Sequence, residues 1–439
     1  MASAFDLVMI GAGPACVGAL SAIRPGQRIC VLTGATPQHH PGKIHPKIRA
    51  VAHERREPPG LRRSFAIAGP TGSKLFSTAA EGGLANYWGQ QFLRYERADP
   101  WPAYIFDDYT DYLGVCKKIE SIFYLTPPTE CTSDAAAIGG GYTAQTPRLL
   151  VGTDEAPGSD LFAMRLALRH LVARHAAQTI PLHAVSWAVD GGGVRIQLSD
   201  GETIRATRAV LAAGVVGSVQ LTMASCPEVT AAEFSDHAPY MLYTRGLDRV
   251  RRVKRVDDLR HFNALTIEKL EDERCQLFAS VYRMGQASLS LLLSAAGLPP
   301  MLRGWKAIPF ADFVKPVQVW TEATVSRLRI DSANGTASVV GFPDRDADST
   351  LHSFVQWLKF NGVAVKVTVS EIGGGLHYHA AMVTTDRGVM SLATFLAERF
   401  GQQVVCLDSS VLDQIGCRPH TLTAMASANK LSGRTVPSS

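Results

Sequence analysis

The chain has 439 residues, of which 46% are hydrophobic and 19% charged, with a formal net charge of +5. This composition is typical of a globular protein with room for two domains, and the weak, diffuse positive charge gives no support to nucleic-acid binding. No apolar run reaches about 18 residues, so we expect no transmembrane helix.

The eight cysteines are scattered and include no Cys-x-x-Cys pair. We therefore interpret them as reduced structural cysteines of a cytoplasmic protein. The first strand begins by Phe5, which leaves no room for a secretory leader. The histidines of the basic loop Thr36–Arg63 have no acidic or cysteine neighbours at ligand spacing, so no metal site is expected there.

In chain order, the first predicted element is a continuous apolar strand at Phe5–Ile10, as in a sheet covered on both faces. The glycine turn Gly11–Ala15 follows and opens a helix at Cys16–Ile23. This turn matches a dinucleotide-binding fingerprint except at the third glycine, where Cys16 is small enough for close packing of helix on strand. We expect the pyrophosphate of a dinucleotide at the N-terminus of this helix.

The second parallel strand, Arg28–Leu32, ends at Thr33, where an acidic residue normally binds the adenosine ribose. A threonine hydroxyl can hydrogen-bond a ribose, but without charge assistance. Helices are predicted over Asp107–Phe123 and over Asp160–His175, the latter with Asp160 as its cap.

Alternating strands are predicted over Val185–Val210. The segment Val210–Leu221 (VLAAGVVGSVQL) then predicts a strand that returns to the nucleotide sheet about two hundred residues after the first. Gln403–Leu407 predicts one more buried parallel strand. Between these two, a hairpin of Thr324–Ile330 and Ser338–Phe342 indicates a second domain. A nucleotide site built from distant segments is typical of large flavoproteins.

Four segments, in order, resemble the glucose–methanol–choline (GMC) family of FAD-dependent oxidoreductases. They are GAGPA at 11–15, GGLANYWG at 82–89, VLAAGVVGSVQLTMAS at 210–225 and CLDSSVLDQIGCRPHTLTAMASA at 406–428. The resemblance implies an α/β fold with a discontinuous, doubly wound, Rossmann-like FAD-binding domain made of 1–225 and 363–439. It also implies a smaller α+β substrate domain, built on an antiparallel sheet, from 226–362.

The resemblance further implies FAD, held non-covalently because no histidine stands in the GGLANYWG loop. Asp408 and Ser409 resemble residues that approach the ribityl chain in the family, and Trp88 lies near the isoalloxazine there or is simply a core aromatic. The candidate cofactor contacts are Gly11, Gly13, Pro14, Ala15, Thr33, Gly82, Gly83, Asn86, Trp88, Gly89, Val185, Ala213, Gly214, Ser218, Asp408 and Ser409.

In the family, a histidine near the C-terminus takes the proton from a substrate hydroxyl while hydride passes to the flavin. Within EIGGGLHYHAAM (371–382), His377 has the family's spacing to a small pair and is the expected base, with His379 as its competitor. Imidazole suits this role because its pKa lies near working pH. His420 is expected as the second imidazole, with Cys417 and Arg418 as alternatives. Polar loop or helix-cap roles for these histidines stay open.

The implied activity is oxidation of a CH–OH group in a small-molecule substrate, including a biosynthetic one. The alternatives are amine oxidation or desaturation of a biosynthetic intermediate, and a flavin-binding scaffold that has lost catalysis. The basic run Asp248–Arg260 is either a solvated face or a docking site for an acidic carrier or a phosphorylated substrate. The apolar segment Ala287–Leu298 predicts a buried helix.

Overall fold

The computed structural model describes residues 5–34, 61–68, 74–78, 80–87, 91–124, 135–150, 163–247, 250, 263–282, 314–331, 337–342, 348–369 and 377–435. Asp160, Trp88, Gly89 and Ala287–Leu298 lie outside these residues, as does all of the basic run except Val250. Asn86 is described by its backbone alone.

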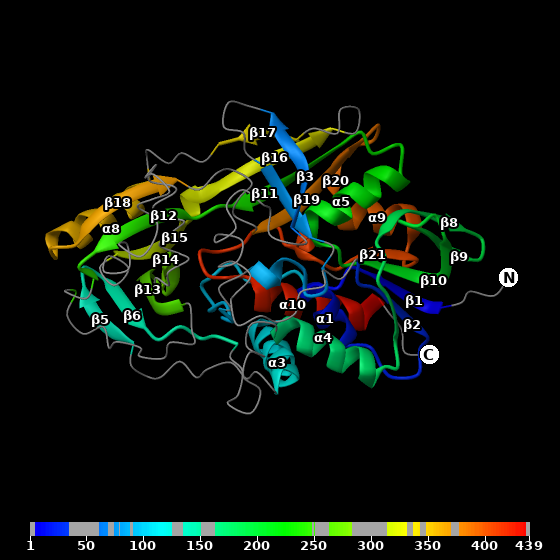
Figure 1. Cartoon of the computed structure of the whole chain (residues 1–439), viewed down its shortest axis with the longest axis horizontal. Helices are drawn as coiled ribbons and strands as arrows, with labels where there is room; N and C mark the ends of the chain where they lie inside the picture. Colours follow the sequence, from blue (N-terminus) through cyan, green and yellow to red (C-terminus); the bar gives the residue numbers. More distant parts are fainter. Residues whose placement is uncertain are drawn as a thin grey trace, which may run out of the picture.

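The strands predicted at the nucleotide site form one sheet in the right-hand part of Figure 1. Strands β1 and β2 are mainly apolar, and their buried residues fit a sheet covered on both faces. The sheet order is β7 (Gln178–Ile180), β2 (Ile29–Leu32), β1 (Phe5–Ile10), β10 (Thr203–Leu211), β9 (Gly193–Leu198) and β8 (Ala184–Asp190), with β21 (Val404–Cys406) also paired to β10. The predicted return of the chain to β1 is confirmed, because β10 pairs with it in parallel.

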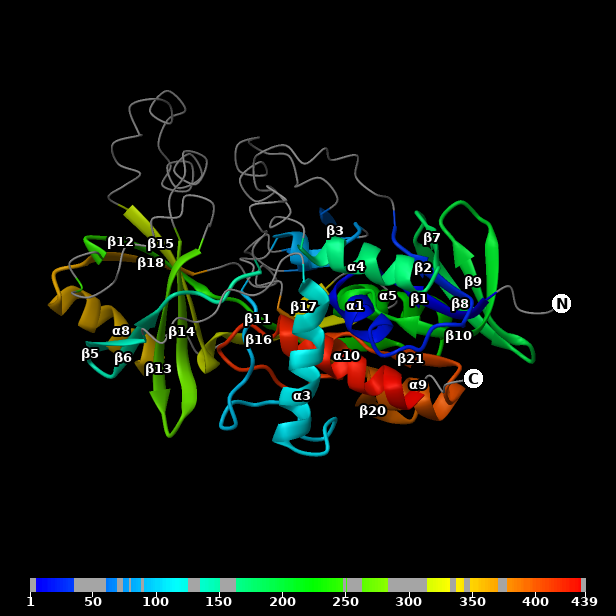
Figure 2. The same cartoon turned by 90° about the horizontal axis from the view of Figure 1, so that it is seen from below.

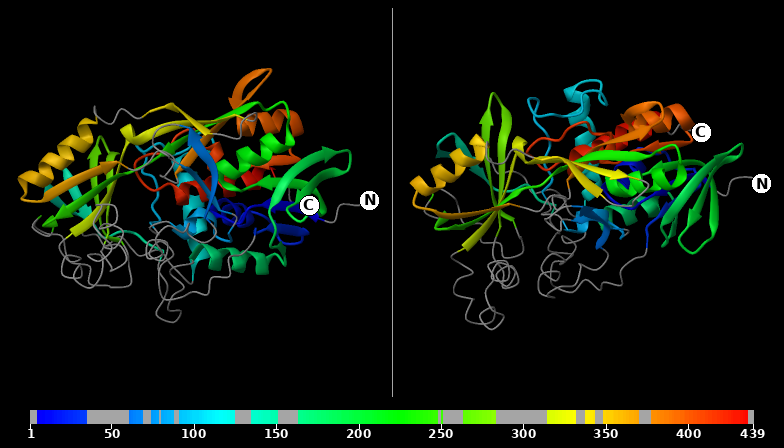
Figure 3. Two further views of the ribbon diagram at one scale, coloured as in Figure 1. Left: turned by 45° about the horizontal axis from the view of Figure 1, so that its top comes forward. Right: turned by 90° about the horizontal axis from the view of Figure 1, so that it is seen from above.

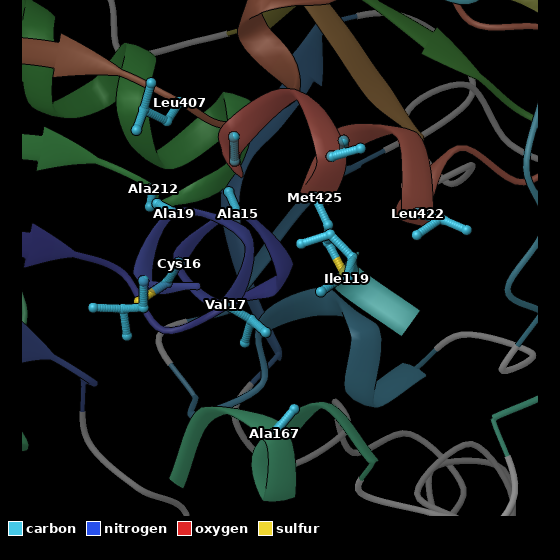
Figure 4. Close-up of a cluster of buried hydrophobic side chains, with 14 of the residues drawn as sticks. Ala15, Cys16, Val17, Ala19, Ile119, Ala167, Ala212, Leu407, Leu422 and Met425 are labelled. Carbon is cyan, nitrogen blue, oxygen red and sulfur yellow. The ribbon is translucent and has the colours of Figure 1, made fainter. Parts of the chain in front are cut away.

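Helices cover both faces of this sheet, which makes the domain doubly wound (Figure 2). One face packs against α1 (Pro14–Leu20), α3 (Tyr109–Glu120), α4 (Ala163–Arg174) and α10 (Thr421–Thr435). The other packs against α5 (Gly214–Ser225) and α9 (Leu392–Phe400). Figure 4 shows the small side chains of α1 between Met425 of α10, Ile119 of α3 and Ala167 of α4.

Helix α1 approaches α10 closely because its residue 18 is glycine. A Cβ atom at Gly18 would lie 2.2 Å from the carbonyl oxygen of Met425, far inside van der Waals contact. The Gly18 carbonyl accepts hydrogen bonds from Ser21 Oγ at 2.6 Å and from Asn429 Nδ2 at 3.3 Å. The first helix of the nucleotide turn is therefore fixed by the helix that follows the last candidate site residue, His420.

A second sheet lies over α5 and includes β11 (Ala231–His237) as an inner strand. Its order is β20 (Gly388–Ser391), β19 (Tyr378–Thr385), β11, β16 (Val325–Asp331), β17 (Ala337–Gly341), β3 (Leu61–Ala68) and β4 (Lys74–Thr78). The predicted hairpin is confirmed as the antiparallel pair β16–β17. This sheet carries two of the candidate histidines to the edge of the nucleotide-binding domain.

A third sheet forms the lobe on the left of Figure 1, with α8 (Ser349–Phe360) packed against it, as Figure 3 shows from two further sides. Its order is β18 (Ala364–Val369), β12 (Tyr240–Arg245), β15 (Val314–Thr321), β14 (Arg274–Tyr282), β13 (Asn263–Glu271), β6 (Tyr142–Gln145) and β5 (Ala136–Gly139). Strands β5, β6 and β18 thus join this sheet from segments assigned by sequence to the FAD-binding domain. The division into 1–225 plus 363–439 and 226–362 stays a prediction.

The other local predictions agree with the structure where it describes them. Asp108 caps α3 by accepting the Asp111 N–H, and α4 occupies most of the second predicted helix. The described cysteines are all free and buried. Among the described residues, no helix is long and apolar enough to cross a bilayer.

Candidate active site

The glycine turn after β1 has the geometry that its sequence predicts. Gly11 has φ +113°, and a Cβ there would lie 2.4 Å from the Ala212 carbonyl oxygen, so both conformation and space require glycine. The Gly82 N–H donates to the Ala12 carbonyl at 2.8 Å, and a Cβ on Gly83 would come within 3.0 Å of Gly13 Cα. The second glycine segment therefore lies directly against the first.

The start of α5 meets the end of β21 beside this turn. Gly214, with φ +73°, begins α5, and Ala213 precedes it. The buried Ser218 hydroxyl donates to Asp408 Oδ2 at 2.5 Å, and Asp408 Oδ1 accepts the Ser410 N–H at 2.9 Å. Asp408 thereby caps the short helix η8 (Ser409–Val411). Candidate residues from the N-terminal, middle and C-terminal segments gather around the carboxyl ends of β1, β10 and β21.

Four further candidates lie at three different places in the fold. Pro14 and Ala15 begin α1, where a helix N-terminus is available to an anion. Thr33 follows β2 and is buried, with its Oγ1 3.4 Å from the carbonyl oxygens of Gly34 and Ile180. Val185 lies on β8, two strands away from β10, and its side chain is 39% exposed. The structure does not bring Val185 beside the glycine turns.

His377 and His420 come together from separate segments. Their ring centroids are 5.0 Å apart and the rings are nearly perpendicular. Trp320, near the end of β15, also stacks on His377, with ring centroids 5.6 Å apart and an angle of 14° between the ring planes. Strand β19 packs against η8, and η8 packs against α5, so the imidazoles adjoin the segment that carries Asp408.

A β-bulge sets the direction of the histidine segment. Glu233 of β11 pairs with Met382, but Ser235 pairs with His379, so β19 has one residue more than its partner strand. Ala380, within the bulge, has φ +55°, a conformation that favours glycine. This is the first position of the small pair that follows His377. A glycine in the family's pattern would adopt this conformation without strain, whereas here an alanine does so.

His379 is turned into the protein. It is 3% exposed, and its Nδ1 donates to the His377 carbonyl oxygen at 3.2 Å. Burial lowers the pKa of His379 to about 4 and that of His420 to about 3, with a smaller effect of the neighbouring imidazoles. Both rings are therefore neutral at pH 7. His377 is only half-buried.

His237, at the end of β11, also belongs to this cluster and was not found by sequence reasoning. Its backbone N–H donates to the His377 carbonyl at 3.4 Å, and its Nε2 donates to the Thr321 carbonyl at 2.8 Å. Burial lowers its pKa to about 4. No sequence signal marked it, because it joins the others only through the pairing of β11 with β19. Among the described residues, no group of three or more His, Cys, Asp or Glu side chains could hold a metal ion.

Arg418, an alternative for the second catalytic position, has another role in the structure. Its buried guanidinium donates to Asp99 Oδ2 at 2.5 Å and to Glu268 Oε2 at 2.8 Å. Asp99 precedes α3 and Glu268 belongs to β13, so Arg418 joins the nucleotide-binding part to the third sheet. Cys417 is buried too, with its Sγ 3.4 Å from the Gln276 carbonyl oxygen. Because both side chains have these other partners, we expect His420, rather than Arg418 or Cys417, at the second catalytic position.

The fold and the glycine turns together define an α/β protein with a discontinuous, doubly wound, Rossmann-like domain and a second, largely antiparallel part. No protein-family model and no curated protein matches the chain. Among solved structures, it is similar to the crystal structure of pyridoxine 4-oxidase from Mesorbium loti, with a TM-score of 0.60 and 13% sequence identity. The match covers 98% of this chain and 99% of the other, so the likeness in fold extends over both parts.

Proposed function

We propose that this protein is a short, divergent GMC-type oxidoreductase that uses non-covalent FAD to oxidise a CH–OH group of a small molecule. The observation that carries the proposal is the contact between the rings of His377 and His420, which come from two distant segments. They lie beside η8, which packs against α5. The full-length likeness to an oxidase supports it at the level of fold.

The residues present fit a dinucleotide. Gly11 allows the turn to pack tightly, since a Cβ there would collide with the Ala212 carbonyl, and a pyrophosphate is proposed to bind at the N-terminus of α1. Gly82 and Gly83 lie against the same turn, and Thr33, which follows β2, is proposed to contact the adenosine ribose. Ser218 fixes Asp408 at the end of β21. When bound, FAD supplies the two-electron acceptor that the side chains themselves lack.

The histidines divide the proton chemistry between them. His377 is proposed to take the proton of the substrate hydroxyl, because its ring is half-buried, whereas His379 is turned inward with its Nδ1–H already donated. A group with a pKa of about 4, such as His379, is a weak base at pH 7. His420 stays neutral and can orient the substrate oxygen by a hydrogen bond, since its buried Nδ1 has no partner among the described residues.

The cofactor is tested first. Purified protein should carry FAD, and acid precipitation should release it into a yellow supernatant, because the cradle offers contacts but no covalent attachment is expected. A control precipitation of a Gly11→Val variant should yield little flavin, since the added side chain collides with the Ala212 carbonyl. A colourless protein that cannot be reconstituted with FAD contradicts the proposal.

The reaction is tested next, by an anaerobic screen of alcohols, sugars and amines for bleaching of the bound flavin. His377→Ala should retain flavin but reduce it about 10²–10⁴ times more slowly, the usual cost of losing a general base. His379→Ala, the matched control two residues away, should lose less. Bleaching by amines alone would favour amine oxidation, and an inactive His379→Ala beside a normal His377→Ala would reverse the assignment.

A further inference from the structure

His237 connects three elements at the proposed active site. It ends β11, its backbone N–H contacts the His377 carbonyl, and its ring reaches the last residue of β15, Thr321. A carbonyl oxygen can only accept, so Nε2 carries the hydrogen and the ring is a neutral tautomer with its lone pair on Nδ1. The side chain is 1% exposed, so the ring has almost no direct contact with solvent.

Thr321 is itself firmly held. Its carbonyl also accepts the Thr324 hydroxyl at 2.8 Å, and its own hydroxyl donates to Asp348 Oδ2 at 2.5 Å. Asp348 is the N-cap of α8, where its Oδ1 accepts the Leu351 N–H at 2.9 Å. The hydrogen bond from His237 therefore attaches the histidine segment to a rigid point of the third sheet.

The residue before Thr321 is Trp320, whose indole stacks on the His377 ring. The same His377 has its carbonyl oxygen bound by the His237 N–H and by His379 Nδ1. His237 thus holds both partners of the stack, the backbone of His377 through its own N–H and the indole through Thr321. Losing the ring contact would remove a direct link between the end of β15 and β19, two strands of different sheets, and leave the end of β15 held by its pairing with β12 and by the pairing of Val325 with His237.

We infer that His237 is a positioning residue, which joins the end of β15 to the end of β11 and so keeps the Trp320 indole against the His377 imidazole. The inference rests on the proposed function for its catalytic consequence, since the orientation of His377 matters most if His377 is the base. The neighbouring titratable rings, His379 and His420, stay neutral at pH 7 and do not compete for this task.

The substitutions separate the hydrogen bond from the bulk of the ring. His237→Gln keeps an N–H group of suitable reach for the Thr321 carbonyl, whereas His237→Met fills similar space without a donor. His175→Met is the matched control, because His175 is also buried and donates through Nε2 to a carbonyl, that of Leu20 at 3.0 Å, but lies in the α1–α4 region. Trp320→Leu defines complete loss of the stack.

The first readout needs no substrate. The His377 Cε1–H resonance of the FAD-loaded, histidine-labelled protein is assigned with His377→Asn, and its ring-current displacement reports the indole stack. In His237→Met it should move toward its position in Trp320→Leu, while His237→Gln and His175→Met leave it near the parent value. If His237→Met does not fold, His237→Asn replaces it, since the shorter amide cannot reach Thr321. If the His377 resonance does not move in His237→Met, or in His237→Asn where that variant replaces it, the inference is overturned.

The second readout is the rate of flavin reduction by the best alcohol of the anaerobic screen. His237→Met should lower the limiting rate about 10–100-fold with little change in apparent KM, because misplacement by about 1 Å can cost 10²-fold. Adding Trp320→Leu should cost nothing further, since both changes remove one contact. Full additivity overturns the inference. If no substrate bleaches even the parent protein, the proposed function fails, while the resonance still decides the role of His237.

Discussion

Gly18 provides a sharp test of the packing that supports the candidate site. In Gly18→Ala, the new methyl group would lie 2.2 Å from the Met425 carbonyl oxygen and 2.9 Å from Met425 Cα. The backbone of α10 would have to retreat by about 1 Å to restore van der Waals contact. Overpacking of this kind costs about 1–3 kcal/mol, and the rigid backbone on the other side places this case at the upper end. Alanine recovers about 1 kcal/mol of helix propensity.

The net expectation for Gly18→Ala is a loss of about 2 kcal/mol in the free energy of unfolding. Gly114→Ala in α3 is the matched control, because a Cβ there meets nothing within 4 Å and the helical gain of up to about 1 kcal/mol is unopposed. Denaturant unfolding of both variants with FAD in excess, followed by circular dichroism, measures the difference. Equal stability of the two variants would show that α1 and α10 do not pack as described.

The remaining predictions concern pH and cofactor affinity. Burial lowers the pKa of His237 and His379 to about 4 and of His420 to about 3; the unfolded chain, with histidine pKa values near about 6.5, therefore binds more protons in the window from that value down to about 4. The free energy of unfolding should fall as pH decreases through this window, by at most about 1.4 kcal/mol per pH unit for each histidine. Denaturant titrations at pH 7 and pH 5 should show a smaller fall for His237→Gln than for the parent protein. An equal fall in the two proteins would contradict this. Thr33→Glu should tighten FAD by about tenfold in flavin-fluorescence titrations, because a charged hydrogen bond to the ribose is about 1–1.5 kcal/mol stronger than a neutral one. Thr33→Asp is measured beside it, and parent-like or weaker binding by both variants would place the ribose elsewhere.

The nucleotide-binding part was predictable because its signals are local. β1 and β21 are short, mainly apolar strands and β10 ends in the apolar residues Ala209–Leu211, each followed by a glycine turn or a helix cap. Such segments indicate buried parallel strands without knowledge of their partners. The pairing of β1 with β10 followed from the two glycine turns. His377 and His420 were reached by resemblance, and the structure brings their rings together.

The residues that sequence reasoning missed are those defined by distant partners. Arg418 reads as a charged neighbour of His420, but its carboxylates are 319 and 150 residues away in the chain. His237 is a lone histidine at a strand end until β11 pairs with β19. Gly18 reads as an ordinary helical glycine until α10 lies against it. Strands β5 and β6 are short, and nothing in their composition indicates that β6 would pair with β13 and β5 with β6.

Because the strands of the first sheet come from distant segments of the chain, this sheet cannot be completed early in synthesis on the ribosome. Strand β1 is synthesised before the rest of this sheet, its partner β10 follows about two hundred residues later, and β21 and α10 come only at Val404–Cys406 and Thr421–Thr435. At the usual rate of about 5–20 residues per second, β1 and α1 are synthesised tens of seconds before β21 and α10, which complete the burial of their apolar surface. During that interval these segments are exposed to aggregation, so the nascent chain is a natural client for chaperones that bind extended apolar sequence.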